Sequence, residues 1–253
     1  MSADELWPEG VGRHVLDAVD STNAEAGRLA EAGLSGPAWV LAKMQTAGRG
    51  RRGRPWASPR GNFYASLVMQ PPEPARAVAL RSFAAALALR EALVGLTGLP
   101  QGFALKWPND VLLNGGKLAG ILLESVGQGA GVAHLVIGFG VNLISAPEPG
   151  QVEPGALLPV SLLAETGLRL PPATVLAALA PAWARWEAVF LGIGFAPVRA
   201  EWLRHAAQLG QPIRARTGGN VQSGIFETVD AQGALVLATP AGRVAIPAAE
   251  VFF

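Results

Sequence analysis

The sequence predicts an α+β protein, in which a mixed β-sheet packed with helices is followed by a small all-β module. Three observations predict this fold. Apolar segments of strand length alternate with segments whose apolar residues recur at helical spacing. Asn114-Gly115-Gly116 separates two apolar runs as a hairpin turn does. From Gln211 onwards, short alternating segments are separated by glycine-containing turns such as Gly218-Gly219.

The N-terminal part begins with a strand, a helix and a second strand. Residues 11–19 have the pattern of a short strand, and Asp20 to Asn23 offer N-cap residues for a helix that ends at Gly33. Residues 38–44 form the next predicted strand, which leads into a loop rich in glycine and arginine over residues 45–61. A further strand is predicted over residues 63–70.

The middle of the chain predicts one long helix and then a series of strands. Apolar residues at helical spacing predict an amphipathic or largely buried helix over residues 76–95. The strands that complete a mixed sheet are expected over residues 103–107, 111–113, 118–126 and 132–143.

After a loop rich in proline and glycine over residues 144–155, the pattern becomes helical and then changes again. Helices are expected over residues 157–166, 172–191 and 195–207. The all-β module is expected to contain strands over residues 212–216, 223–229, 234–238 and 243–247. The predicted division is therefore a larger domain over residues 1–209 and a small one over residues 210–253.

Composition excludes several classes of function. Twenty Lys and Arg against nineteen Asp and Glu give a net charge of +1, so no attraction of the whole molecule to nucleic acid or membrane is expected. The absence of Cys excludes disulfides and thiolate chemistry, and the three His have no metal-ligand spacing. The N-terminus carries acids and lacks the pattern of a secretory signal, and no apolar run is long enough to cross a membrane. These features favour a cytoplasmic protein.

The most informative segment is the loop from Gln45 to Gly61, named here the Arg loop. It contains five arginines and no acidic residue. Glycines allow backbone N–H groups to approach an anion, and guanidinium groups match carboxylate and phosphate oxygens. Gly48, Gly50 and Gly53 have the spacing of a dinucleotide fingerprint, but Pro55 and Pro59 argue against the helix that this motif requires. A solvated basic loop, or single-stranded nucleic-acid binding with Trp56 as a stacking platform, are the alternatives.

Two further segments carry candidate chemistry. Lys106 to Asp110 lie just before the hairpin, and Lys117 begins an apolar strand after it, where an ammonium needs an anionic partner. That partner is a ligand or Asp110, and a hairpin with edge charges is the alternative. The strand over residues 136–143 has Gly138, Gly140 and one amide, Asn142. Interior glycines in a strand indicate close approach of a ligand or of another backbone, and helix packing is the alternative.

These segments, in this order and approximate spacing, resemble the biotin–protein ligase family. The resemblance covers essentially the whole chain and is closest to the short bacterial form without an N-terminal DNA-binding domain. It implies a catalytic domain related to class II tRNA synthetases and a C-terminal SH3-like barrel. Alanine precedes Glu250 where the family usually has glycine, at a position expected to lie outside the site.

The resemblance implies roles for individual residues. Lys117, Arg51 and Asp110 are the expected catalytic residues, with Asp110 orienting or deprotonating the acceptor amine. The expected biotin-binding residues are Ser21, Thr22, Asn23, Gln45, Arg49, Gly50, Arg51, Lys117, Gly120, Gly138 and Gly140. The expected residues for ATP and the adenylate are Arg49, Arg51, Arg54, Trp56, Lys106, Asn109, Lys117 and Asn142. Trp107 is expected to add apolar surface near the ligand.

The resemblance also implies the reaction and its partners. ATP and biotin are the expected substrates with Mg²⁺, for which Asp110 is a possible ligand. The expected partner is the biotin carboxyl carrier protein of acetyl-CoA carboxylase, with other biotin-dependent carboxylases possible, and the enzyme is expected to be a monomer or a homodimer. A lipoate–protein ligase is the nearest rival. A nucleic-acid-binding module and a biotin-sensing repressor are the rivals from other classes.

Overall fold

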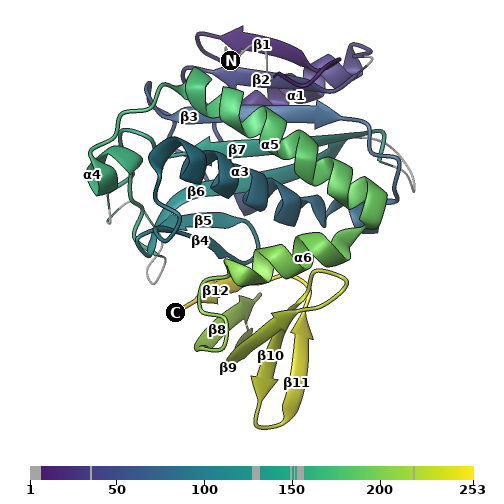
Figure 1. Ribbon diagram of the computed structural model, residues 1–253, viewed down its shortest axis with the longest axis vertical. Coiled ribbons are helices and arrows are strands. Elements are labelled where there is room, and N and C mark those ends of the chain that lie inside the picture. Colours follow the sequence, from purple (N-terminus) through teal and green to yellow (C-terminus); the bar gives the residue numbers. More distant parts are fainter. Residues whose placement is uncertain are drawn as a thin grey trace.

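The computed structural model describes residues 7–34, 36–126, 132–148, 150, 152, 157–218 and 220–253. A seven-stranded sheet in the order β1-β2-β3-β7-β6-β5-β4 forms its larger part (Figure 1). Only β1 and β2 pair in parallel among these strands, which confirms the mixed sheet. The strands are β1 (Gly12–Leu16), β2 (Ala38–Ala42), β3 (Phe63–Met69), β4 (Phe103–Lys106), β5 (Asp110–Leu113), β6 (Gly116–Val126) and β7 (His134–Val141).

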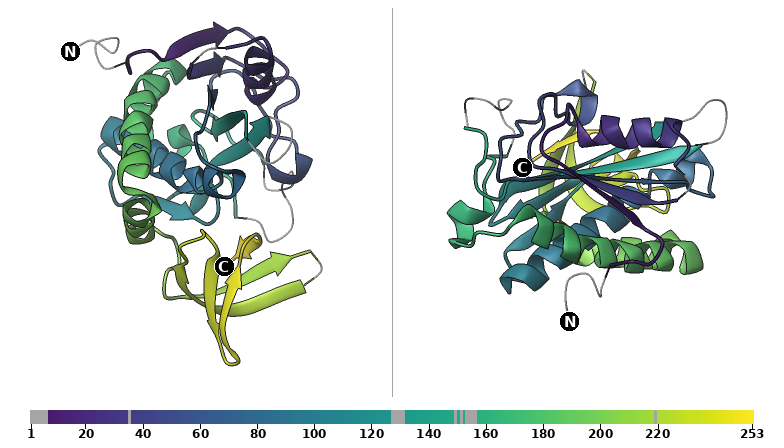
Figure 2. Two further views of the ribbon diagram at one scale, coloured as in Figure 1. Left: turned by 90° about the vertical axis from the view of Figure 1, so that its right-hand side faces the viewer. Right: turned by 90° about the horizontal axis from the view of Figure 1, so that it is seen from above.

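Helices cover both faces of this sheet. α1 (Thr22–Glu31) lies on one face, and α3 (Arg81–Thr97) and α5 (Pro172–Ile193) pack together on the other (Figure 2). The alternation of side chains along a strand explains the two faces. In β2, Ala38 and Val40 pack under α1, whereas Trp39 and Leu41 belong to the larger core below α3 and α5.

The helical part differs from the sequence prediction at two places. The helix predicted over residues 76–95 is two helices, α2 (Ala75–Val78) and α3. Leu80 and Phe83 donate backbone hydrogen bonds to residues three positions earlier, which tightens the turn between them and interrupts the α-helical ladder. The helix predicted over residues 157–166 is only α4 (Leu162–Thr166), because residues 158 and 160 exchange backbone hydrogen bonds with Lys117.

The remaining helices match their predicted ranges closely. α5 is long and apolar enough to pass a simple test for a membrane span. Its buried side chains, which include Val175, Leu179 and Trp183, belong instead to the main core. α6 (Phe195–Arg204) follows and leads to the second sheet.

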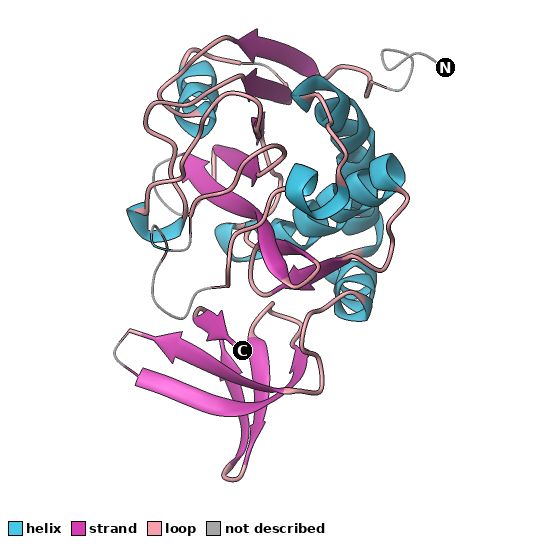
Figure 3. Ribbon diagram, turned by 90° about the vertical axis from the view of Figure 1, so that its left-hand side faces the viewer, coloured by secondary structure: helices cyan, strands magenta, loops and turns pink. Residues whose placement is uncertain are grey.

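The C-terminal part is an antiparallel five-stranded sheet below α6 (Figures 1 and 3). Its strands pair in the order β11-β10-β9-β8-β12. Their bounds are β8 (Pro212–Thr217), β9 (Asn220–Val229), β10 (Leu235–Thr239), β11 (Gly242–Ile246) and β12 (Glu250–Phe252). The first four were predicted, but β12 was missed because three residues are too short for a recognisable alternation. β12 pairs with β8 and so brings the C-terminal end of the chain towards the larger sheet.

Candidate active site

A cleft of about 760 Å³ opens on the α1 face of the large sheet, between the Arg loop, β6, β7 and β12. A volume of this size is typical of small-molecule sites. Every residue assigned from the sequence to biotin, ATP or catalysis lines it: Ser21, Thr22, Asn23, Gln45, Arg49, Gly50, Arg51, Arg54, Trp56, Lys106, Asn109, Asp110, Lys117, Gly120, Gly138, Gly140 and Asn142. Segments far apart in the sequence therefore meet in one cleft.

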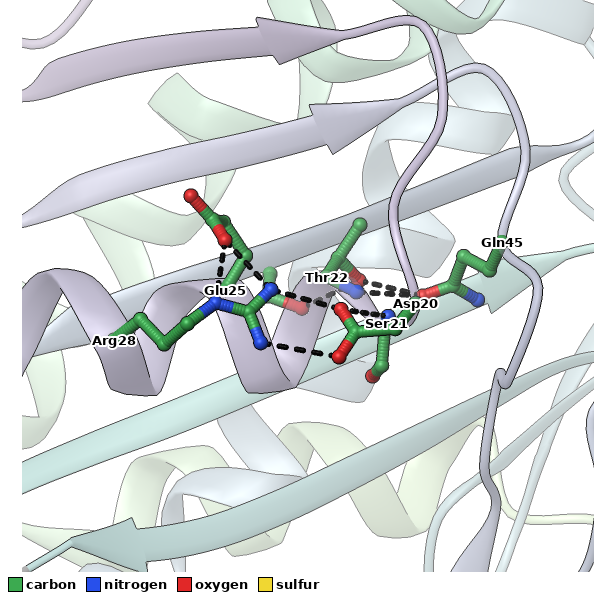
Figure 4. A network of polar contacts seen from close by, with 7 residues as sticks. Asp20, Ser21, Thr22, Glu25, Arg28 and Gln45 are labelled. Carbon is green, nitrogen blue, oxygen red and sulfur yellow. Dashed lines mark hydrogen bonds and ion pairs between the residues drawn. The ribbon is translucent and has the colours of Figure 1, made fainter.

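One end of the cleft is neutral and polar. The backbone N–H and the hydroxyl of Thr22 both donate to Oε1 of Gln45, at 2.7 and 3.1 Å (Figure 4). Nε2 of Gln45 donates to the Ser58 hydroxyl at 2.9 Å. Ser21 is the N-cap residue of α1, but its side chain makes no capping hydrogen bond. Ser21 therefore takes the N-cap position that the sequence offered without its side chain capping the helix, and Ser21, Thr22 and Asn23 line the cleft.

The start of α1 is held in place by a carboxylate. Asp20 accepts the backbone N–H of Ser21 at 2.8 Å and two hydrogen bonds from Arg28, at 2.8 and 3.0 Å (Figure 4). The hydrogen bonds from Arg28 and then from the Ser21 backbone lower the pKa of Asp20 to about 2, from its ordinary value of 3.8. The carboxylate therefore stays ionised over the whole neutral range and fixes the polar end of the cleft.

The alternating glycines of β7 make room for two side chains. A Cβ on Gly138 would lie 2.1 Å from Oδ1 of Asn23, and a Cβ on Gly140 would lie 2.7 Å from Nε1 of Trp56. Gly120 pairs with Gly140 across β6 and β7, and a Cβ on Gly120 would lie 3.1 Å from the Trp56 ring. The glycines shape the cleft walls by admitting Asn23 of α1 and Trp56 of the Arg loop, so the packing that the sequence left as the alternative to ligand approach is part of their role.

Three cationic side chains and one carboxylate meet beyond this polar end. Lys117 Nζ lies 2.8 Å from Oδ1 of Asp110, and Lys106 Nζ lies 3.9 Å from Oδ2. Arg51 donates to the Asn109 amide at 3.4 Å. Burial lowers the pKa of Lys106 and that of Arg51, while Asp110 opposes both shifts. One buried carboxylate thus faces several cations, which leaves a net positive field for an anionic ligand.

The Arg loop folds against itself and against the sheet. A Cβ on Gly48 would lie 2.6 Å from the Ser58 hydroxyl and 2.7 Å from the Trp56 carbonyl, so only glycine fits there. Trp56 Nε1 is buried and has no hydrogen-bond partner within the part of the chain that the structure describes. Lys117 Nζ lies 5.7 Å from the centre of the Trp56 ring, close enough for a cation–π contact.

The C-terminal sheet contributes to the site, which the sequence did not indicate. Ala249 to Phe252 line the cleft, and Glu250 forms ion pairs with Arg52, Arg54 and Arg216. Burial opposes a lower pKa for Glu250, but the hydrogen bonds from Arg216 and Arg54 lower it. The expectation that the alanine before Glu250 lies outside the site is therefore wrong, because β12 folds back onto the Arg loop.

The indole of Trp107 and the amide of Asn142 each donate a hydrogen bond to a backbone carbonyl of the protein. Trp107 is buried and does not line the cleft, because its indole N–H donates to the carbonyl of Gly233 at 3.1 Å. It therefore connects the two sheets and does not provide the apolar cleft surface that the sequence had suggested for it. The Asn142 side chain lines the cleft but donates to the carbonyl of Val160 at 3.2 Å.

The described residues contain no group of three or more His, Cys, Asp or Glu arranged to hold a metal ion. The cleft therefore offers Asp110 and Glu250 as single carboxylates, and each already faces cationic side chains. A cleft with a neutral polar end and a cationic centre suits an enzyme that holds anionic groups in contact and stabilises the charge that develops on them.

Comparison with known proteins specifies the family. The model of the biotin/lipoate A/B protein ligase family matches residues 15–142, and the model of the biotin protein ligase C-terminal domain matches residues 209–253. The chain belongs to the biotin/lipoate A/B protein ligase family.

Relatives of known name agree. The chain is 59% identical to the biotin--[acetyl-CoA-carboxylase] ligase of Paracoccus denitrificans, over 94% of this chain and 99% of that protein. It is 36% identical to the bifunctional ligase/repressor BirA of Escherichia coli, over 88% of this chain and 68% of that protein. The biotin protein ligase of Aquifex aeolicus, solved in complex with biotin and ATP, superposes with a TM-score of 0.81 at 26% identity, over 95% of this chain and 98% of that chain.

Proposed function

We infer that this chain is a biotin–protein ligase, which activates biotin with ATP and transfers it to a lysine of the carrier protein of acetyl-CoA carboxylase. The observation that carries this inference is the cleft itself, in which a neutral polar end adjoins a cluster of cations. The ureido ring of biotin needs uncharged donors and acceptors, whereas its carboxylate and the phosphates of ATP need positive charge.

The first half-reaction joins two anions. A carboxylate oxygen of biotin attacks the α-phosphorus of ATP, an acyl–phosphate bond forms, and the bond to pyrophosphate breaks. Lys117 and Arg51 are the residues proposed to hold the two anions together and to stabilise charge on the phosphoryl oxygens. Arg49 and Arg54 are proposed to order the Arg loop over the adenylate, with Trp56 as its apolar wall.

In the second half-reaction the carrier lysine attacks the acyl carbon, AMP leaves, and the amine loses its proton. Asp110 has an ammonium close to each carboxylate oxygen, at 2.8 and 3.9 Å. This geometry supports an orienting role, in which Asp110 holds Lys117 and Lys106 at the reacting groups. It is less suited to taking a proton from the incoming amine.

The proposed biotin-binding residues are those at the polar end of the cleft together with the glycines of β6 and β7. Ser21, Thr22, Asn23 and Gln45 provide donors and acceptors for the ureido ring, and Gly138 and Gly120 leave the slot narrow. Lys106, Asn109 and Asn142 are proposed to lie beside the ATP moiety.

We propose that Mg²⁺ enters with the phosphates of ATP. Mg²⁺ commonly takes one or two carboxylates together with phosphate oxygens. The two carboxylates of the cleft are already held by arginines and lysines, so the phosphates and water would supply most ligands. We also propose that the protein is cytoplasmic. The chain is further proposed to divide into a catalytic unit over residues 1–209 and a C-terminal unit over residues 210–253.

The test is incubation of the purified protein with ATP, Mg²⁺, a recombinant biotin carrier domain and either biotin or lipoate, followed by mass spectrometry of the carrier. A mass gain with biotin, dependent on ATP, is expected. A gain with lipoate alone would assign the chain to the lipoate branch, and no gain with either would contradict the proposal.

Two variants and a control test the assignment of the site. Lys117→Ala and Arg51→Gly are expected to impair adenylate formation or retention by more than roughly tenfold, as loss of a group that stabilises transition-state charge does. Lys43→Ala is the matched control, because Lys43 is exposed and pairs with Asp17 outside the cleft. Unchanged ligation in both cleft variants, with intact folding, would refute the assignment.

A further inference from the structure

Two side chains behind the cleft hold the amide of Asn23. The Ser66 hydroxyl donates to Oδ1 of Asn23 at 2.6 Å, and Nδ2 of Asn23 donates to Oε2 of Glu124 at 2.7 Å. Ser66 is fully buried, and neither Ser66 nor Glu124 lines the cleft. Both therefore act on a ligand only through other residues.

Glu124 decides which way the Asn23 amide points. A serine hydroxyl can donate to an amide oxygen or accept from an amide nitrogen, so Ser66 tolerates either orientation. A carboxylate only accepts, so Glu124 requires the nitrogen on its side and leaves Oδ1 on the side of Ser66. Gly138 makes this arrangement possible, because any side chain there would occupy the position of the amide.

The same carboxylate also faces the Arg loop. Oε1 of Glu124 lies 3.6 Å from an Nη atom of Arg49, and both side chains are partly exposed. An exposed pair of this kind is weak, and it strengthens when a bound ligand excludes water. One carboxylate therefore contacts the polar end of the cleft with one oxygen and the Arg loop with the other.

A second route leads from Ser66 back to the Arg loop. Ser66 Oγ is 2.8 Å from the hydroxyl of Thr22, and the backbone N–H of Thr22 donates to Oε1 of Gln45 at 2.7 Å. Gln45 donates to Ser58, and the Ser58 hydroxyl donates to the Trp56 carbonyl at 2.8 Å. The polar end of the cleft is thus connected to the loop at both Arg49 and Trp56. Buried networks of this kind hold their members rigidly when all are satisfied.

We propose that Ser66 and Glu124 are positioning residues for biotin recognition, and that Glu124 also couples the Asn23 amide to the order of the Arg loop. This inference rests on the proposed function, because it takes biotin as the ligand whose neutral polar ring meets Asn23 and Thr22. Neither Ser66 nor Glu124 lines the cleft, so neither would be identified by its contacts with a bound ligand.

The test compares three variants in pyrophosphate exchange, which measures adenylate formation without a carrier. Ser66→Ala and Glu124→Ala leave buried polar atoms of Asn23 without a partner, so the KM for biotin is expected to rise roughly tenfold to one hundredfold. For Ser66→Ala the KM for ATP is expected to stay within about twofold, because the side chain of Ser66 contacts Thr22 and Asn23 and none of the residues assigned to ATP.

Glu124→Gln tests the contact of Glu124 with Asn23 separately from its contact with Arg49. Its amide oxygen can still accept from Asn23, while its amide nitrogen would face Arg49. The KM for biotin is therefore expected to stay within about threefold of wild type, and the bound adenylate to dissociate roughly two- to fivefold faster. Glu31→Gln, at the exposed end of α1, is the matched control and is expected to change neither quantity.

The outcomes distinguish this inference from the proposed function. If wild-type protein exchanges no pyrophosphate with biotin, the proposed function fails. If wild type is active but Glu124→Ala and Ser66→Ala leave the KM for biotin within twofold, the positioning role is overturned. A fall in melting temperature and kcat without a change in the KM for biotin would also overturn it, since a structural role alone predicts that result. Equal adenylate release from Glu124→Gln and wild type would overturn the coupling to Arg49.

Discussion

Gly138 on β7 directly faces the amide of Asn23 on α1, and a Cβ on Gly138 would lie only 2.1 Å from Oδ1 of Asn23. Ser66 on β3 is paired with Gly138 and donates to the same oxygen. The absence of a side chain at Gly138 therefore leaves the space that the Asn23 amide occupies.

Gly138→Ala is expected to displace Asn23 and to raise the KM for biotin by roughly tenfold or more, because the amide loses its buried partners. Gly27→Ala is the matched control on the same helix as Asn23. A Cβ on Gly27 meets nothing within 4 Å, so this variant is expected to stabilise the protein by roughly 0.5–1 kcal/mol through helix propensity. Steady-state kinetics and chemical denaturation measure both effects, and equal biotin kinetics in the two variants would contradict the role of Gly138.

Glu250→Gln is expected to loosen the Arg loop. Glu250 on β12 holds Arg54 and Arg52 of the loop together with Arg216 of β8. Without the carboxylate the loop loses its charge-assisted contact with the C-terminal sheet, and trypsin should cleave at the loop arginines faster than in wild type. Glu227→Gln, whose partner Arg243 lies on β11, is the control. Identical cleavage rates in wild type and Glu250→Gln would show that the loop is held by other contacts.

Arg81→Met is expected to lower stability without changing the chemistry. Arg81 on α3 is fully buried, donates to Glu187 of α5 at 2.7 Å and pairs with Glu73 at 2.9 Å. Removing one partner of a buried pair costs about 3–5 kcal/mol, which corresponds to a fall in Tm of about 6–20 °C for a protein of this size.

The double variant Arg81→Met with Glu187→Leu removes the uncompensated charge of Glu187. It is expected to recover part of the lost stability, as replacement of a buried ion pair by apolar residues often does. Calorimetry measures the melting temperatures, and kcat for adenylate formation at 25 °C should stay at the wild-type value in both. If the double variant loses more stability than the two single variants lose together, this account is contradicted.

Asp20 makes the free energy of unfolding depend on pH in the acidic range. Its pKa is about 2 in the folded protein, below the ordinary value of 3.8 for an aspartate. The carboxylate therefore stabilises the fold fully above pH 4 and loses this contribution as the pH falls towards 2. Asp20 and Arg28 are both about half exposed, so screening keeps the contribution below about 1 kcal/mol.

The difference in unfolding free energy between wild type and Asp20→Asn should accordingly be largest at neutral pH and shrink as the pH falls from about 4 towards 2. Urea denaturation at several pH values measures it. Arg28→Gln should reproduce the effect, and the two substitutions combined should cost less than their sum. A difference that grows as the pH falls would reverse the expected sign.

Much of this protein is predictable from its sequence. Apolar periodicity located most strands and the long helices, and Asn114-Gly115 forms the predicted hairpin turn with both residues at positive φ. The Arg loop, Lys117 and the glycines of β7 carried the resemblance to the ligase family. The assigned residues meet in one cleft because their segments lie within the strands of one sheet or in the connections between those strands.

The tertiary structure alone decided which residues complete the site. Ser66 is a single hydroxyl in an apolar strand, and its contact with Asn23 spans 43 positions, while that of Glu124 with Asn23 spans 101. β12 and Glu250 reach the cleft only because the C-terminal sheet folds back. Local propensity and periodicity report the conformation of neighbouring residues, whereas these contacts depend on how distant segments pack, which no local pattern contains.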